Sequence, residues 1–423
     1  MAQKTLELGI PAHVDAGKPP LGRPDLVAAF LRWTWWRAAL HRGWWLATGV
    51  YLVVDAQLSP SQLVLIGVAQ AVTALIFEVP AGVVADTISR KWSLVVSHVL
   101  MGTAMIATGL VTDFGPLVAT QMLWGLSWNF ASGADVAWIT DELDEPARIS
   151  GVLVLSGRAQ LTGAAAGLTG IGALASLTQR STAMVVAGAA MLLLGLYVVL
   201  RFHEQRFVPT YTRRWSASWS ILVRGFSLVR RSRAILALFA ATFLVNGAAT
   251  SGRLQTRRLV DIGFPSDPLV WFTALGILTL LVGAIAFRVV ARQIENVQTT
   301  LRGYVLACAI GAAGLICLAA APEKVSGSAA VLLVAGIAVP LTRTLGTIWV
   351  NQQTVGDVRA TVHSLLAQAE YLGAIVWGLA VSVVARIAGL SLALVACGAL
   401  FAITIFLIQR EPAASGRPRA TRP

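Results

Sequence analysis

Long apolar runs alternate with short polar connections along the whole chain. Twelve of these runs are about 20 residues long, enough to cross the hydrocarbon core of a bilayer. Each run is expected to form a helix, because a segment in lipid must satisfy its own backbone hydrogen bonds. The predicted spans lie at 36–57, 61–84, 93–112, 115–138, 151–173, 181–201, 234–253, 268–291, 303–321, 328–350, 364–386 and 390–409.

The longest connection divides the twelve spans into six and six. The predicted parts are an N-terminal segment (1–35), a first bundle (36–201), a basic linker (202–233), a second bundle (234–409) and a basic tail (410–423). Within the linker, the stretch from Trp215 to Val229 alternates aromatic and aliphatic residues with Arg. That stretch fits either an amphipathic helix on the membrane surface or an ordinary basic loop.

An internal repeat relates the two predicted bundles at an offset of 211 residues. Trp138 and Arg148 fall on Trp349 and Arg359, with the Trp-to-Arg separation unchanged. The other matches are Gly125 with Gly336, Leu161 with Leu372 and Gly167 with Gly378. Repeated halves of this kind are typical of transporters. The predicted fold class is an all-α membrane protein with twelve transmembrane helices in two pseudo-symmetric six-helix bundles.

Charge is scarce and unevenly distributed. Hydrophobic residues make up 56% of the chain and charged residues 13%, against about a quarter in soluble domains. Of the 33 Lys and Arg, 24 fall on the side that holds both chain ends, six on the other side and three within spans. The positive-inside rule makes the first side cytoplasmic. We therefore expect a multi-pass cell-membrane protein with both ends in the cytoplasm, and the excess of Arg over Lys favours a bacterial source.

The connection between the second and third spans reads "GVVADTISRKW" and carries most of the charge in its region. It resembles the corresponding loop signature of the major facilitator superfamily, although Thr87 replaces an Arg and Ser89 a Gly of that signature. The matching positions are Gly82, Asp86, Arg90, Lys91 and Leu94. Together with the spans, the linker and the repeat, the resemblance covers essentially the whole chain. It points to the drug:proton antiporter branch.

The charges of this loop also have a local physical interpretation. Asp86 is expected near the positive N-terminal ends of the fifth and eleventh helices. Arg90 and Lys91 would pair with the acidic stretch that begins at Asp141, forming a conformational latch that breaks when the cytoplasmic side opens. Gly82 would let a neighbouring helix approach closely. The alternative is that Arg90 and Lys91 act only as topology anchors.

Polar residues within spans mark a candidate substrate path, because such groups usually face a cavity or a partner. In the superfamily the first, fourth, seventh and tenth helices line the central cavity. Carried over to this chain, that rule gives a cavity wall of Asp55, Trp124, Trp128, Asn129, Asp135, Asn246 and Arg343. For Asp135 the alternative is a pair with Arg90, and for the two Trp it is packing in the core or against lipid.

Three carboxylates are candidates for proton coupling: Asp55, Glu78 and Glu370. Removal from water makes a carboxyl group easier to keep protonated, which allows proton exchange near neutrality. An ion pair between Arg158 and Glu370 is the alternative. On the fourth span, Gln121 stands where proton-coupled drug exporters of the superfamily carry an Arg. This departure indicates either a different coupling arrangement or no proton coupling.

The fifth span contains "GAAAGLTGIG", from Gly163 to Gly172. It is similar to the Gly-rich motif of superfamily antiporters, with Leu168 in place of the Pro of that motif. Small residues at this spacing permit close helix packing, whatever the direction of transport.

These features predict a secondary active transporter that exports a largely apolar small molecule by alternating access with proton antiport. The rivals are export of a siderophore, peptide or lysolipid, and solute uptake. Arg253, Arg257 and Arg258 by the outer mouth, with Arg343, would favour an anion. A membrane enzyme is disfavoured because the five His are scattered and no phosphate loop is present, and a sensor would be a further alternative. We expect a monomer with no cofactor, no metal and no nucleic-acid partner.

Overall fold

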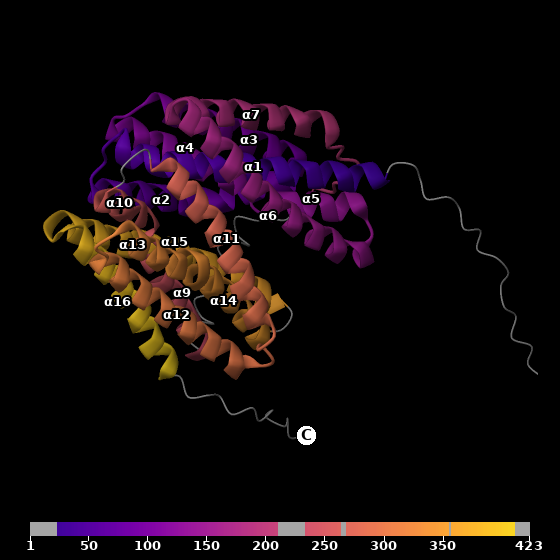
Figure 1. Ribbon diagram of the computed structural model, residues 1–423. Helices are drawn as coiled ribbons and strands as arrows, with labels where there is room; N and C mark the ends of the chain where they lie inside the picture. Colours follow the sequence, from indigo (N-terminus) through magenta and orange to yellow (C-terminus); the bar gives the residue numbers. More distant parts are fainter. Residues whose placement is uncertain (1–22, 210–232, 264–267, 355–356, 411–423) are drawn as a thin grey trace, which may run out of the picture.

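The computed structural model describes residues 23–209, 233–263, 268–354 and 357–410. Every regular element in these ranges is helical, and the helices form twelve rods that follow the predicted spans in order (Figure 1). The segment before residue 23, the stretch from Trp215 to Val229 and the tail beyond Arg410 lie outside the described residues. The division of the chain at 35, 201, 233 and 409 therefore stays a prediction.

Six rods build each bundle, and three of the twelve rods in the described ranges are interrupted. The first bundle contains α1 (Arg23–Val54), α2 (Pro60–Thr87), α3 (Arg90–Leu110), α4 (Phe114–Ala131) continued by α5 (Ala134–Leu143), α6 (Pro146–Leu177) and α7 (Arg180–Arg201). The second contains α9 (Arg233–Ala249) continued by α10 (Gly252–Ile262), α11 (Leu269–Ala291), α12 (Val297–Ala320), α13 (Lys324–Val331) continued by the π-helix η1 (Leu332–Ala338) and α14 (Val339–Gln353), α15 (Asp357–Ile387) and α16 (Gly389–Gln409).

Most of the rods have the length and composition of membrane spans. Within the described ranges, nine rods are long and apolar enough to cross a bilayer. The other three are α1, α4 with α5, and α6, which carry residues such as Arg37, Gln121 and Arg158. All three border the space between the bundles, as described below. Their lower hydropathy fits a position in which one face meets a cavity instead of lipid.

The two bundles repeat the same packing scheme. α1 packs on α6 as α9 packs on α15, and α3 packs on α7 as α12 packs on α16. Close contacts recur too: a Cβ at Gly163 would lie 2.3 Å from the carbonyl oxygen of Trp35, and one at Gly373 would lie 2.1 Å from that of Phe243. The predicted fold class, with two pseudo-symmetric six-helix bundles, is confirmed.

Local sequence explains the interruptions. Gly133, between α4 and α5, has φ of 78°, a left-handed conformation that glycine adopts without strain. Pro340 follows η1 and has no backbone N–H to donate to the preceding turn, which fits the widened helix there. Between α9 and α10, the amides of Thr250 and Ser251 bond to the carbonyls of Gly247 and Ala248, three residues back, so the four-residue spacing of the α-helix is interrupted there.

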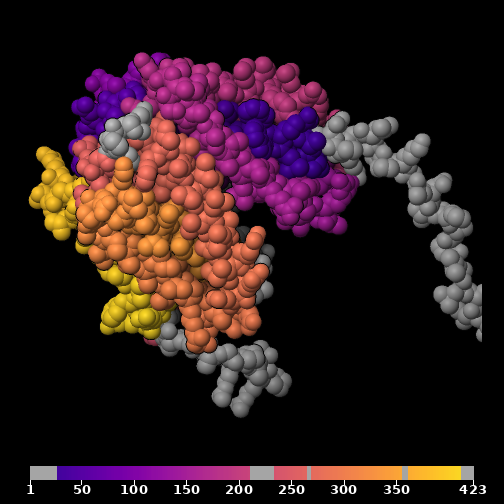
Figure 2. Space-filling model, in the orientation of Figure 1, coloured from indigo at the N-terminus to yellow at the C-terminus, as the bar shows by residue number. Residues whose placement is uncertain are grey.

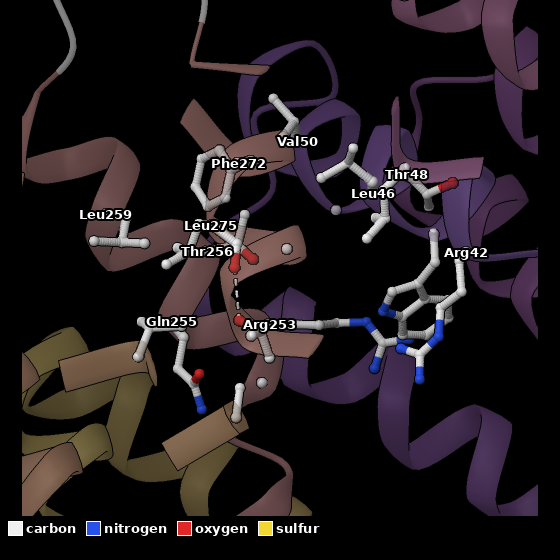
Figure 3. Close-up of a pocket in the computed structure, with 18 of the residues that line it drawn as sticks. Arg42, Leu46, Thr48, Val50, Arg253, Gln255, Thr256, Leu259, Phe272 and Leu275 are labelled. Carbon is white, nitrogen blue, oxygen red and sulfur yellow. Dashed lines mark hydrogen bonds between the residues drawn. The ribbon is translucent and has the colours of Figure 1, made fainter. Parts of the chain in front are cut away.

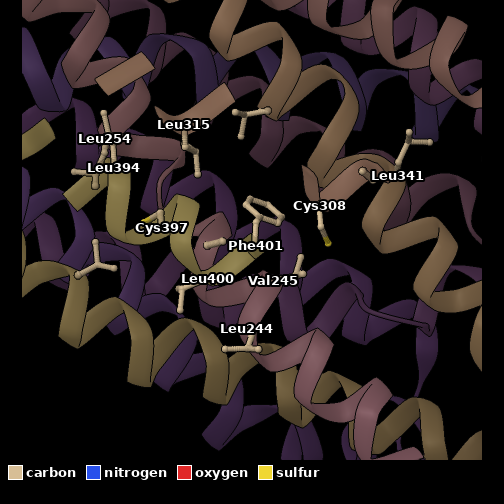
Figure 4. Close-up of a cluster of buried hydrophobic side chains, with 14 of the residues drawn as sticks. Leu244, Val245, Leu254, Cys308, Leu315, Leu341, Leu394, Cys397, Leu400 and Phe401 are labelled. Atoms are coloured by element: carbon tan, nitrogen blue, oxygen red, sulfur yellow. The ribbon is translucent and has the colours of Figure 1, made fainter. Parts of the chain in front are cut away.

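Each bundle has its own hydrophobic core. The core of the first is built around Trp33, Trp44 and Trp138. The second, shown in part in Figure 4, brings Phe401 of α16 against α12, where Gly311 makes room for the ring. Because most of the apolar burial lies within the bundles, each is equipped to move as a rigid body.

The bundles meet at one end of the molecule and diverge at the other. At the closed end, which carries residues 55–59, the hydroxyls of Ser61 and Ser382 are 2.8 Å apart and Arg257 donates to the carbonyl of Leu58. At the open end, where α1 begins and α16 ends, Figure 2 shows a hollow between α6 and the second bundle. α6 and α11 contact each other near the closed end, through Gly172 and Thr273.

Candidate functional site

A cavity of about 410 Å³ lies between the two bundles (Figure 3). α1, α4 and α6 of the first bundle contribute to its wall, and so do α9, α10, α11, η1 and α14 of the second. Its size is that of a site for one drug-sized molecule. Because the wall belongs to both bundles, any relative motion of the bundles reshapes the cavity.

Apolar side chains make up most of this wall. They include Leu46, Val50, Leu168, Leu259, Phe272, Leu275 and Leu280. The polar part contains the hydroxyls of Thr48, Thr250, Thr256 and Thr279 and the amides of Gln121 and Gln255. Of the described residues that line the cavity, those that carry a charge are Arg42 and Arg253.

A chain of hydrogen bonds fixes Arg253 at the cavity. Its Nη2 donates to Oε1 of Gln70 at 2.6 Å, and Nε2 of Gln70 donates to Oε1 of Gln121 at 3.0 Å. Nε2 of Gln121 donates in turn to the hydroxyl of Thr108 at 3.1 Å. Gln121 therefore takes part in the site although it is neutral. Gln70 links Gln121 to the guanidinium of Arg253, which belongs to α10 of the other bundle.

An aromatic cluster lies beside the cavity on α1 and α4. The ring of His41 stacks on Trp124 at 5.5 Å between centroids with an interplanar angle of 17°, and Trp45 lies 5.1 Å from Trp124. Trp45 lines the cavity, and the guanidinium of Arg253 lies 5.3 Å from its ring centroid. Trp128 also belongs to the cluster and is 42% exposed. Trp124 and Trp128, the two Trp predicted to line the cavity, stack on each other, and Trp124 contacts Trp45.

A second, smaller pocket lies within the second bundle. It encloses about 120 Å³ between α9, α12, α14 and α15. Asn246, Arg343 and Glu370, which sequence reasoning assigned to two different roles, line it together with Tyr304 and His363. Arg343 attracts Glu370 and repels Arg42 across the gap between the bundles. Among the described residues Arg158 has no ion pair with Glu370, and its side chain is exposed.

Asp55, Asn129 and Asp135 do not line the cavity. α1 ends at Val54, so Asp55 lies beyond the helix and its Oδ2 accepts from Nε of Arg180 at 2.6 Å. Nδ2 of Asn129 donates to the carbonyl of Ala74 on α2, which turns it towards a neighbouring helix.

Asp135 pairs with Arg37 at 3.3 Å, which is neither of the two contacts expected of it. None of these three polar residues lines the cavity in this conformation, and their role in a substrate path stays a prediction.

Glu78 makes a contact between the bundles. Its Oε2 accepts from Nε2 of Gln368 on α15 at 2.6 Å, and its charge repels that of Glu370, two residues further along the same helix. α2 and α15 therefore stay in contact well beyond the closed end. Two of the three coupling candidates, Glu78 and Glu370, lie near this junction, and Asp55 does not.

The charged loop after α2 is bound within the first bundle. Arg90 forms an ion pair with Asp141 of α5 and lies 3.9 Å from Asp86. Lys91 does not reach the acidic stretch, because its Nζ donates to the carbonyl of Val199 at 2.9 Å. Glu204 holds the start of α3 by accepting from the amides of Arg90 and Lys91.

The expected opening of this latch stays a prediction that this conformation does not show. Arg90 and Asp141 both belong to the first bundle, and their pair is intact while the ends of the bundles are apart. A Cβ at Gly82 would meet no described atom within 4 Å, so no helix uses its small size in this conformation. A latch role for the five residues stays a proposal for the other conformation.

Sequence reasoning missed Arg42, Trp45 and Gln70, and it placed Arg253 at the outer mouth. The available signal for Arg253 was the polar "TSGR" stretch within the seventh apolar run, which marks the break before α10. No sequence signal pairs Gln70 with Gln121, because the bond depends on how α2 packs on α4. Among the described residues, no three His, Cys, Asp or Glu gather as a metal site requires.

Comparisons with known proteins agree with this architecture. The nucleoside transporter NupG has a TM-score of 0.72 at 14% identity, with 91% of this chain and 98% of that chain covered. A POT family transporter in complex with 5-aminolevulinic acid has a TM-score of 0.70 at 12% identity, with 93% and 97% covered. The human organic anion transporter TETRAN has a TM-score of 0.57 at 17% identity, with 93% and 100% covered.

At sequence identities this low, the similarity to these transporters shows a shared fold and nothing more. A search among curated protein sequences found no significant match. The family model described as the Major Facilitator Superfamily matches residues 37–378, which is most of the chain. The chain therefore belongs to the Major Facilitator Superfamily and is a transporter of the secondary kind.

Proposed function

We propose that this protein exports a largely apolar small molecule from the cytoplasm by alternating access, driven by proton antiport. The observation that carries the proposal is the cavity of about 410 Å³, whose mostly apolar, Trp-bearing wall is drawn from both bundles. The charge distribution along the sequence supports a cytoplasmic position for the open end. A conformation open at that end loads its substrate from the cytoplasm, as export requires.

The transporters of similar fold differ in the polarity of the compounds named for them, from nucleosides and 5-aminolevulinic acid to organic anions. The wall of this cavity offers few hydrogen-bonding groups relative to its apolar residues, which fits the last of these classes best. For proton coupling, Glu78 and Glu370 are the better candidates. Both lie near the junction of α2 and α15, where a change of charge affects contacts between the bundles. Asp55 is engaged with Arg180 and is expected to be dispensable for coupling.

Transport into inverted vesicles with an imposed proton gradient tests the proposal. A panel of fluorescent drugs supplies the substrates, and wild type is expected to accumulate at least one of them only while the gradient lasts. Glu78→Gln and Glu370→Gln should lower this accumulation about tenfold or more, while Asp55→Asn retains it. The Glu78→Gln variant keeps the hydrogen bond from Gln368, because a glutamine amide oxygen accepts as a carboxylate oxygen does.

Glu295→Gln is the matched control, since Glu295 is exposed in the connection before α12. Equal, gradient-driven accumulation by both glutamate variants would remove them from the coupling mechanism. Accumulation that is the same with and without the proton gradient would contradict proton antiport.

A further inference from the structure

Among the described residues that line the central cavity, no acidic side chain balances its positive charge. Arg42 comes from α1 of the first bundle and Arg253 from α10 of the second, and Figure 3 shows the two side chains extending towards each other. In the described part of the chain, neither forms an ion pair with a carboxylate. The two carboxylates that the sequence analysis placed in the cavity wall are engaged elsewhere, Asp55 with Arg180 and Asp135 with Arg37.

Arg253 is held in place by neutral groups. Gln70 accepts one of its hydrogen bonds and the face of Trp45 lies beneath its guanidinium, and neither cancels the charge. A guanidinium has five N–H donors, so most of them remain available to a ligand. An interior charge without a counter-charge is costly, and an anion bound in the cavity would remove that cost.

The surroundings of Arg253 leave space for its guanidinium. Gly67 of α2 lies against the tip of the side chain, and a Cβ at this position would come 2.8 Å from Nη1. Arg343 of α14 lies close enough to Arg42 to repel it, but it lines the smaller pocket within the second bundle. Of the described residues, the guanidinium groups that line the central cavity are therefore those of Arg42 and Arg253.

Beyond the two arginines the cavity becomes apolar. Phe272, Leu275 and Leu280 of α11 line the wall contributed by the second bundle, and Leu46 and Val50 line that of α1. Trp45 offers a flat ring next to the guanidinium of Arg253. A ligand that satisfies both parts has an anionic group at one end and an aromatic or aliphatic body at the other.

We propose that the substrate is an amphipathic organic anion, with a carboxylate, sulfonate or phosphate group between Arg42 and Arg253 and its apolar body against Trp45 and α11. The inference deepens the proposed function by naming the substrate class, and as a statement about substrate it rests on that function. Bidentate bonding by a guanidinium fits all three anionic groups. The amide chain from Gln70 to Gln121 fixes the guanidinium before the anion arrives.

Binding to the purified full-length protein in detergent tests this proposal. The probes are three naphthalene derivatives of similar size: naphthalene-1-sulfonate, the neutral naphthalene-1-sulfonamide and the cationic naphthalene-1-methylamine. Isothermal titration calorimetry measures each dissociation constant. We expect wild type to bind the sulfonate about tenfold or more tightly than the sulfonamide, and the amine most weakly, because charge-assisted hydrogen bonds favour the anion.

Arg253→Gln should lose this preference, weakening the sulfonate about tenfold or more while leaving the sulfonamide unchanged. Gly67→Ala retains every charge but displaces the tip of Arg253, so it should weaken the sulfonate selectively as well. Arg386→Gln removes one positive charge from an exposed position on α15 and serves as the control that leaves the preference intact.

Equal binding of the three probes, no binding of any of them at millimolar concentration, or an unchanged preference in a folded Arg253→Gln variant would each overturn the proposal. Failure of the proposed function is distinguishable from these results. A protein that prefers the sulfonate but moves no compound in vesicles retains the anion site and loses the export role. A protein that exports neutral or cationic drugs without an anion preference retains the export role and loses the anion site.

Discussion

A disulfide that joins Ser61→Cys to Ser382→Cys is expected to abolish transport until it is reduced. The two hydroxyls are 2.8 Å apart and join α2 of the first bundle to α15 of the second at the closed end. Alternating access requires this end to open, and a covalent link prevents the opening. Vesicle transport should fall about tenfold or more after oxidation and return after a thiol reductant is added. Mass spectrometry establishes the extent of linking.

Three substitutions provide the background, Cys308→Ala, Cys317→Ser and Cys397→Ala, because all three native cysteines are free thiols. The matched control is a disulfide between Leu315→Cys on α12 and Gly398→Cys on α16 of one bundle, where a Cβ at Gly398 would lie 3.6 Å from the Cβ of Leu315. That link should leave transport close to the level of its reduced form. Full activity of a completely linked Ser61→Cys/Ser382→Cys protein would mean that the closed end never opens during transport.

Gly167→Ala is expected to destabilise the first bundle severely. A Cβ at this position would lie 1.9 Å from the carbonyl oxygen of Ala39, so α1 and α6 would have to separate. Both atoms belong to backbones of packed helices and cannot rotate away. The expected loss is about 3 kcal/mol or more in the free energy of unfolding, in the range of severe overpacking. Thermal unfolding in detergent, followed by tryptophan fluorescence, measures it.

Gly170→Ala is the matched control on the same helix. A Cβ there would meet no described atom within 4 Å, and alanine is the better helix former. Its Tm should equal or exceed that of wild type, while Gly167→Ala unfolds at a much lower temperature or fails to accumulate. Similar Tm values for the two variants would show that α1 and α6 are not packed as closely as described.

The arrangement of helices was predictable because lipid imposes a simple rule on sequence. Any run of about 20 apolar residues must be a helix in a bilayer, so hydropathy places the rods without knowledge of their contacts. The ends were less certain. Extending the first span to residue 57 put Asp55 inside the membrane, whereas α1 ends at Val54. Ending the seventh span at residue 253 put Arg253 at the mouth, whereas α10 continues that rod to Ile262.

The composition of the site depended on packing between helices distant in sequence. Asn246, Arg343 and Glu370 were each identifiable as polar residues in apolar runs, and the structure brings them together. Asp135 and Asn129 looked similar in sequence but are turned towards other helices, because a helix has several faces and one sequence does not say which of them meets the cavity. The contact of Arg253 with Gln70 joins residues 183 positions apart and has no local signal.

Distances between spin labels test alternating access most directly. One pair of labels joins Gly151 on α6 to Gln352 on α14 at the open end, and another joins Thr178 to Val325 at the closed end; all four sites are exposed. Electron paramagnetic resonance in lipid nanodiscs gives each distance distribution with and without a transported compound at two pH values. The account predicts that conditions which shorten the first distance lengthen the second. Two distances that never change, or that change in the same direction, would contradict it.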